Sequence, residues 1–217
     1  MTARADKAKG KLWEGNLTAA GLFDLRVVKP ALYDTVEQVR GEHAYRAELS
    51  QYVSEPALSP SPVLSPDTET PPDVWWESLR TDLGTVAQTT TERVAVRQEW
   101  ADRAVPQFLN RPAPQITAWE TAHGDMQPAN LTAESPYLLD WEGFGRAPVG
   151  YDPAMLLGYS LLAPEFAARV RTTFPVLDTE AGRVAQTIVV TELLQSASRG
   201  DYPELVPALR ALAEELA

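Results

Sequence analysis

Three polar residues at fixed distances around a short apolar run constrain this chain more than any other feature. Asp125 is followed five positions later by Asn130, and Asp140 ends the apolar run 137–139. A carboxylate can accept the proton of an attacking hydroxyl, while an amide oxygen and a second carboxylate are ligands that suit Mg²⁺. Each residue alone is also a common turn or cap residue. Together they predict kinase-type phosphoryl transfer at the mouth of one cleft, with Asp125 as the base and Asn130 and Asp140 as metal ligands.

The surrounding sequence resembles the aminoglycoside phosphotransferase-like kinases, a protein-kinase-like family. The resemblance rests on His123-Gly124-Asp125, on Asn130, on Asp140-Trp141-Glu142 and on the segment 150–154, and it extends over residues 119–162. It implies an α+β fold with two lobes, a reduced N-terminal β-lobe and a mainly helical C-terminal lobe. It also implies a phosphotransferase that uses ATP or GTP with Mg²⁺ and acts on a hydroxyl of a small, cationic, aminoglycoside-like molecule.

Three further residues receive roles from this resemblance. His123 is expected to shape the loop rather than to transfer a proton, and Asp152 is expected to tie down backbone amides of the loop. Asp152 also precedes Pro153, which suits a first helical position, so an ordinary N-cap is an alternative. Glu142 lies two residues beyond Asp140, on the same side of a continuing strand. There it is expected to reach a second metal or a substrate amine, or else to be a solvated or salt-bridged residue.

A lysine–glutamate pair is the expected nucleotide-binding contact in the first part of the chain. Lys29 ends a strand predicted at residues 22–29, and Glu42 lies within a helix predicted at residues 34–53. Glu48 on the same helix is the alternative partner. In kinases such a pair holds the nucleotide phosphates.

The composition limits which metals, substrates and macromolecules the chain is expected to bind. The chain has no Cys and two His, so we expect any bound metal to be a hard cation on oxygen ligands. The formal net charge of −11 argues against nucleic-acid binding and is compatible with a cationic substrate, although a solvated acidic surface is the simpler explanation. The resemblance implies substrate contacts at Glu192 and Asp201, where a solvated face is again the alternative. Without a run of about 20 apolar residues or the apolar core of a secretory signal, we expect a cytoplasmic protein without membrane contact.

The Pro-rich stretch at residues 65–72 divides the chain, because repeated Pro prevents a helix from continuing. We expect a reduced N-terminal lobe at residues 1–64, a connector at 65–72 and a helical C-terminal lobe at 73–217. Hydrophobic spacing and cap residues predict the elements of these parts. Strands are expected at residues 11–16, 22–29, 115–119 and 137–140, and helices at 34–53, 73–88, 91–109, 153–162, 164–173, 179–198 and 203–215.

The first lobe lacks parts that a nucleotide-binding kinase uses. Only Gly10 and Gly15 precede the strand of Lys29, whereas a phosphate-binding loop needs several glycines so that backbone amides can approach the nucleotide. The Pro-rich stretch stands where two strands and a hinge would hold adenine. The sequence therefore leaves a second function open, a degenerate kinase-like protein that binds a ligand or regulates a partner.

Overall fold

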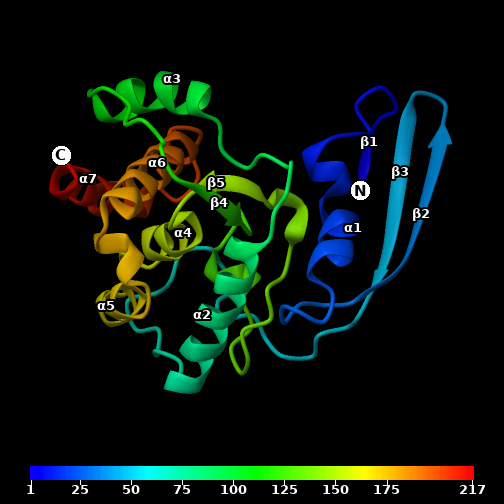
Figure 1. Ribbon diagram of the computed structural model, residues 1–217, viewed down its shortest axis with the longest axis horizontal. Helices are drawn as coiled ribbons and strands as arrows, with labels where there is room; N and C mark the ends of the chain where they lie inside the picture. Colours follow the sequence, from blue (N-terminus) through cyan, green and yellow to red (C-terminus); the bar gives the residue numbers. More distant parts are fainter.

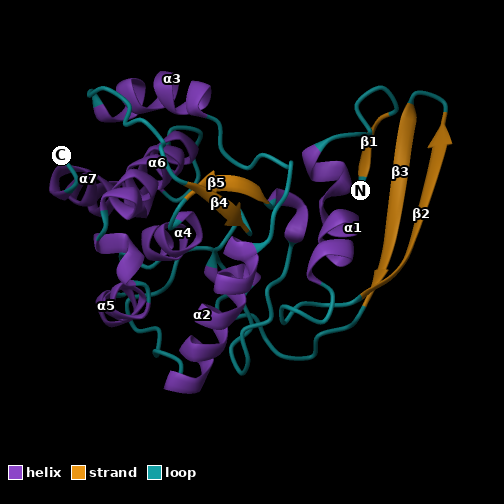
Figure 2. Cartoon of the chain, viewed as in Figure 1, coloured by secondary structure: helices purple, strands orange, loops and turns teal.

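The computed structural model describes residues 1–217, with the exception of the Lys11 side chain. It is an α+β structure in which a three-stranded antiparallel sheet lies at one side and most helices lie at the other (Figure 1, Figure 2). The sheet has the order β1-β3-β2, with β1 at Thr2–Arg4, β3 at His43–Ser50 and β2 at Leu32–Arg40. Helix α1, Lys11–Phe23, lies between this sheet and the rest of the molecule (Figure 1).

The beginning of the chain differs from the sequence prediction. Residues 11–16, predicted as a strand, are the first half of α1, and the strand predicted at 22–29 is the end of α1 followed by turns. The buried side of α1 carries Gly15, Ala19 and Phe23. A Cβ atom at Gly15 would lie 2.5 Å from the Cα atom of Glu142, so the helix approaches its neighbour through small residues. Small residues weaken the hydrophobic period that would identify a helix.

The helix predicted at residues 34–53 is instead the hairpin of β2 and β3. Its two-residue turn contains Gly41 at φ 60°, a backbone conformation that favours glycine. Glu37 and Arg46 are opposite each other in the pairing register and therefore share a face. Arg46 is buried, whereas Val36 and Leu49 are exposed. The face of the hairpin that carries Glu37 and Arg46 is thus the one that packs against the rest of the molecule. The apolar residues of the hairpin therefore do not mark its buried face.

The helices after residue 73 largely follow the prediction. Those predicted at residues 73–88 and 164–173 are confirmed at both ends, while the one predicted at 91–109 begins late because Ala95 and Val96 donate backbone hydrogen bonds to the Arg146 carbonyl. None of the helices in the described chain has the length and apolar content for a membrane crossing. The helices are α2 Asp73–Gln88, α3 Gln98–Leu109, α4 Tyr151–Tyr159, α5 Pro164–Thr173, α6 Glu180–Ala197 and α7 Val206–Glu215.

A two-stranded antiparallel ribbon flanks the predicted loop. Its strands are β4, Trp119–Ala122, and β5, Gly145–Pro148. The strand predicted at residues 115–119 is therefore displaced toward the loop, and the one predicted at 137–140 is reduced to a single bridge between Leu131 and Leu138. Because β4 leads into His123 and β5 follows residues 140–142, the ribbon brings the two halves of the sequence motif side by side.

Candidate active site

A buried carboxylate binds the backbone of the loop that follows β4. Asp152, in the first turn of α4, accepts hydrogen bonds from the backbone N–H groups of His123 at 2.6 Å and Gly124 at 2.9 Å. Burial raises the pKa of Asp152 to about 7, against these two N–H groups, which lower it. Gly124 has φ 84°, and a Cβ atom there would lie 2.6 Å from the Gly143 carbonyl oxygen. The loop therefore requires glycine at this position, and Asp152 makes the contacts that were expected of it.

His123 is fully buried, and burial lowers its pKa to about 4, so the ring is neutral at pH 7. Its Nε2 atom lies 2.8 Å from the carbonyl oxygen of Leu139. Because a carbonyl oxygen only accepts, Nε2 carries the proton, and Nδ1 accepts from the backbone N–H of Asp125 at 3.4 Å. The ring also packs edge-on against Trp141 at 4.6 Å between centroids. Both ring nitrogens thus hold backbone, which fits a role in shaping the loop.

Two side-chain amides hold the Asp125 carboxylate. Asn130 Nδ2 donates to Asp125 Oδ2 at 2.9 Å and to the carbonyl oxygen of Asp125 at 3.0 Å. Gln127 Nε2 donates to the same Oδ2 atom at 3.0 Å. The 3-10 helix η1, Pro128–Asn130, sets the spacing between the two amides. Since the amide nitrogen of Asn130 is directed to Asp125, its oxygen is the atom that a cation would meet.

Asp140 has a left-handed backbone, with φ 58° and ψ 75°, which is uncommon for residues other than glycine, although Asp and Asn adopt it more readily than most. The exposed side chain accepts from the backbone N–H of Glu142 at 3.4 Å and caps the 3-10 helix η2, Trp141–Gly143. The preceding residue, Leu139, donates its N–H to the Asn130 carbonyl at 2.9 Å. Asn130 and Asp140 therefore lie on adjacent segments of chain.

The donor set at these two residues fits Mg²⁺. In the described part of the chain, no three His, Cys, Asp or Glu side chains form a metal-binding group. Mg²⁺ does not need one, because it binds through one or two protein oxygens, substrate phosphates and water. The amide oxygen of Asn130 and the exposed carboxylate of Asp140 are ligands of this kind.

Among the described side chains, no ion pair joins Lys29 to Glu42, so this expectation was wrong. Glu42 is exposed in the hairpin turn, and Lys29 precedes the hairpin at its other end. The nine residues of β2 separate the two by about 30 Å, because an extended strand rises about 3.3 Å per residue. The alternative partner, Glu48, accepts instead from Asn16 at 2.9 Å.

Lys29 still lies close to the candidate metal ligands. It lines, with Asp140 and Asn16, a cavity of about 170 Å³ between the sheet and the loop. Its ammonium group donates to the carbonyl oxygen of Pro30 at 3.3 Å. Burial lowers the pKa of Lys29, and the carboxylate of Asp24 opposes this shift. The cavity therefore combines a cation from one side with a carboxylate from the other.

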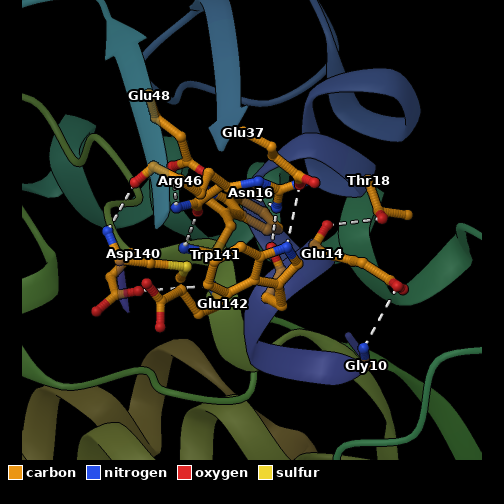
Figure 3. A network of polar contacts seen from close by, with 12 residues as sticks. Gly10, Glu14, Asn16, Thr18, Glu37, Arg46, Glu48, Asp140, Trp141 and Glu142 are labelled. Atoms are coloured by element: carbon orange, nitrogen blue, oxygen red, sulfur yellow. Dashed lines mark hydrogen bonds and ion pairs between the residues drawn. The ribbon is translucent and has the colours of Figure 1, made fainter. Parts of the chain in front are cut away.

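Figure 3 shows a polar network that joins the sheet, α1 and the segment after Asp140. The buried guanidinium of Arg46 pairs with Glu37 at 2.6 Å and lies 3.9 Å from Glu48. Asn16 on α1 donates through Nδ2 to Glu48, and its Oδ1 accepts from the backbone N–H of Trp141 at 3.1 Å. The Asn16 side chain thus connects the sheet to the candidate metal-binding segment.

Glu142 lies in the same region, within the 3-10 helix η2 and not on a continuing strand. Burial raises the pKa of Glu142, and the carboxylates of Asp140 and Glu48 raise it further. Arg93 donates to the backbone carbonyls of Glu142 and Phe144, each at 3.1 Å. The segment is therefore positioned through its backbone.

Acidic and aromatic side chains gather on the helical side of Asp125. Tyr151 is buried and its hydroxyl donates to Glu192. Burial raises the pKa of Tyr159 above its ordinary value, and the charges of Asp125, Glu192 and Asp201 act in the same direction. These three carboxylates therefore produce an overlapping negative potential beside the loop.

Sequence reasoning missed several residues of the site. Gln127, Arg93, Asn16 and Arg46 act through contacts with residues distant in the chain or through a turn, and no motif marks them. The only available signal was the position of Gln127 between Asp125 and Asn130.

No protein-family model matches the chain, and no curated protein matches it in sequence. Solved structures of aminoglycoside phosphotransferase APH(4)-Ia are similar in fold. A thermostable mutant in ternary complex with AMP-PNP and hygromycin B matches with a TM-score of 0.61 at 12% identity, over 96% of this chain and 82% of that chain. The complex with ADP and hygromycin B matches at 0.58 and 11%, over 95% and 82%, and the apo form at 0.58 and 12%, over 99% and 85%. The chain therefore has a kinase-like fold similar to that of aminoglycoside phosphotransferase APH(4)-Ia.

Proposed function

We propose that the protein is an ATP- and Mg²⁺-dependent phosphotransferase whose acceptor is a hydroxyl of a small cationic molecule. The observation that carries this proposal is the bond from Asn130 to the Asp125 carboxylate at 2.9 Å, together with the backbone bond from Leu139 to Asn130. The Asp125 carboxylate thereby has a fixed orientation, and the chain segment of Asn130 is bonded to the segment that leads to Asp140. A carboxylate base with an amide and a second carboxylate is the set that phosphoryl transfer uses.

Each residue has a distinct task in this proposal. Asp125 would orient the acceptor hydroxyl and accept its proton, since a loose transition state demands alignment more than full deprotonation. Asn130 and Asp140 would hold Mg²⁺, which neutralises phosphate charge when bound. His123 and Asp152 would keep the loop backbone in place through the contacts described above.

A cationic acceptor is supported by the charges around Asp125. The carboxylates of Glu192 and Asp201 add to the negative potential of Asp125. The buried tyrosines around them lower the local dielectric constant, which strengthens the attraction of these carboxylates for an ammonium group. APH(4)-Ia was crystallised with hygromycin B. Aminoglycoside-like compounds, with hygromycin B first, are therefore the acceptors to test.

The nucleotide would bind between the two sides of the molecule, at the cavity shared by Lys29 and Asp140. The division into two lobes is kept, but the boundary expected at residues 65–72, between lobes at 1–64 and 73–217, moves earlier in the chain. Leu58 and Leu64 donate backbone hydrogen bonds to Leu131 and Tyr159, on the helical side. We therefore put the passage between lobes at residues 51–55.

A degenerate kinase-like binding protein is the second candidate function. The absence of an ion pair at Lys29 among the described side chains favours it, because kinases use such a pair to hold the nucleotide phosphates. In this case the acidic region would still bind a cation, without phosphoryl transfer.

A phosphoryl-transfer assay separates the two functions. Labelled ATP, Mg²⁺ and a panel of aminoglycosides that includes hygromycin B should give a phosphorylated product with the unmutated protein. Asp125→Asn should lower turnover by about 100- to 10,000-fold, the usual effect of losing a positioned base, while an exposed control variant, Glu134→Gln, should not. Absence of product with every acceptor, alongside saturable binding of an aminoglycoside, would favour the binding protein.

A further inference from the structure

A second cavity lies beside β4 and the start of α4, and it shares no lining residue with the cavity of Lys29. It has a volume of about 330 Å³ and is formed by α2, β4, the start of α4 and the segment after α5. Leu83, Phe174 and Val176 contribute apolar walls. The charged side chains that line the cavity are the carboxylates of Glu120 and Asp152 and the guanidinium of Arg80. This size and this mixture of apolar walls with a few polar groups are typical of small-molecule sites.

Gly84 gives this cavity part of its space. It lies inside α2, where glycine is less favourable than alanine. Glycine has more backbone freedom in the unfolded chain, so it loses more conformational entropy when the helix forms. A Cβ atom at Gly84 would meet no atom within 4 Å. Close packing therefore does not require the glycine, and a larger residue at this position would extend into the cavity.

The carboxylates differ in how they are held. Both oxygens of Asp152 accept from the loop amides of His123 and Gly124. Glu120, in β4, accepts through Oε1 from the backbone N–H of Gly150 at 2.7 Å. In the described residues, no hydrogen bond or ion pair is made by Glu120 Oε2, although burial acts against a charge here and raises the pKa of Glu120. A cation in the cavity would stabilise this charge.

We propose that this cavity binds a small amine with an apolar body, whose ammonium group pairs with Glu120 and whose body contacts Leu83, Phe174 and Val176. Because Asp152 lines the same cavity and holds the amides of His123 and Gly124, an occupant would also alter the backbone of the catalytic loop. Any effect on nucleotide or acceptor affinity would be reciprocal, since linked binding equilibria are reciprocal. The proposal does not depend on the phosphotransferase function.

Protonated 2-phenylethylamine is a suitable probe, with 2-phenylethanol as its neutral counterpart. Both are titrated into ¹⁵N-labelled protein at pH 7 and followed by amide chemical shifts. The amine should bind saturably and shift the signals of Glu120, Thr121 and Gly150, and also those of His123 and Gly124. The alcohol should bind about 10-fold more weakly or not at all, because it cannot form a charge-assisted hydrogen bond.

Two variants locate the site, and each has a matched control. Glu120→Gln should weaken amine binding by about 10-fold, whereas Glu214→Gln, which removes one exposed charge from α7, should not. Gly84→Leu should abolish binding by filling the cavity, whereas Gly84→Ala should retain it. Equal binding of amine and alcohol, or amine binding unchanged in both Glu120→Gln and Gly84→Leu, would overturn the proposal. Amide spectra of the variants establish that each is folded.

Discussion

Replacing Asp152 with Asn would test how the candidate catalytic loop is held and whether Asp152 is protonated. The Asp152 carboxyl is 5% exposed and accepts from two backbone N–H groups. An Asn side chain of the same shape has one accepting oxygen, and its NH₂ group would face the second N–H. One buried donor would be left without an acceptor, which costs about 1–3 kcal/mol of unfolding free energy.

The pH dependence follows from the pKa of Asp152, which folding raises from an ordinary 3.8 to about 7. A group with a raised pKa in the folded state stabilises the fold at pH values below 3.8 and loses this contribution as the pH rises through 7. Between pH 5 and pH 8 the unfolded chain is already ionised while the folded chain holds its proton for about two more pH units. Since one pKa unit corresponds to about 1.4 kcal/mol, the stabilising contribution of Asp152 falls by about 2–3 kcal/mol over this range.

Urea unfolding followed by tryptophan fluorescence at pH 5 and pH 8 measures both quantities. Asp152→Asn should be less stable than the unmutated protein at pH 5 by about 1–3 kcal/mol, and this deficit should shrink by about 2–3 kcal/mol at pH 8. Asp201→Asn, at an exposed position, serves as the charge-matched control and should show no such difference between the two pH values. A deficit for Asp152→Asn that stays constant or grows at pH 8 would mean that the carboxylate is ionised throughout.

Two further substitutions test contacts that motif analysis did not identify. Gly15→Ala should lower the free energy of unfolding by about 1–3 kcal/mol, because the new Cβ atom would lie 2.5 Å from the Glu142 Cα atom. Urea unfolding measures this change. The control Gly21→Ala should not destabilise the protein, because a Cβ atom at Gly21 would lie in open space. Gln127→Leu should lower kcat by about 10-fold and leave the KM for ATP unchanged, because it removes one of the two amides that orient the Asp125 carboxylate. Steady-state kinetics at saturating acceptor measures this effect, and an unchanged kcat would contradict it.

The conformation of the candidate catalytic loop could be predicted from sequence because the proposed chemistry requires particular residue types at short distances along the chain. Asp125 and Asn130 meet across a single 3-10 turn, so their spacing survives in the structure. Gln127 could not be assigned in the same way, because many side chains are compatible with its position.

The N-terminal part could not be predicted because its buried face is charged. Arg46 is covered by α1 and paired with Glu37, while Val36 and Leu49 are exposed on the other face of the hairpin. Hydrophobic spacing identifies buried faces only when burial is apolar, and here the spacing of exposed side chains resembled a helix. Because the hairpin was predicted as a helix, Glu42 was expected beside Lys29. In the structure β2 is extended and places Glu42 at the far end of the hairpin from Lys29.

Isothermal titration calorimetry with ATP, in the presence and absence of Mg²⁺, tests most directly whether the protein is a phosphotransferase. The unmutated protein should bind ATP with Mg²⁺. Asp125→Asn should retain this binding, because Asp125 is proposed to accept a proton and not to hold the metal or the nucleotide. Asp140→Asn should lose the Mg²⁺-dependent part, since a neutral amide cannot offset the charge that holds the cation. No heat of binding from the unmutated protein with millimolar ATP and Mg²⁺ would contradict the phosphotransferase function and leave the ligand-binding alternative.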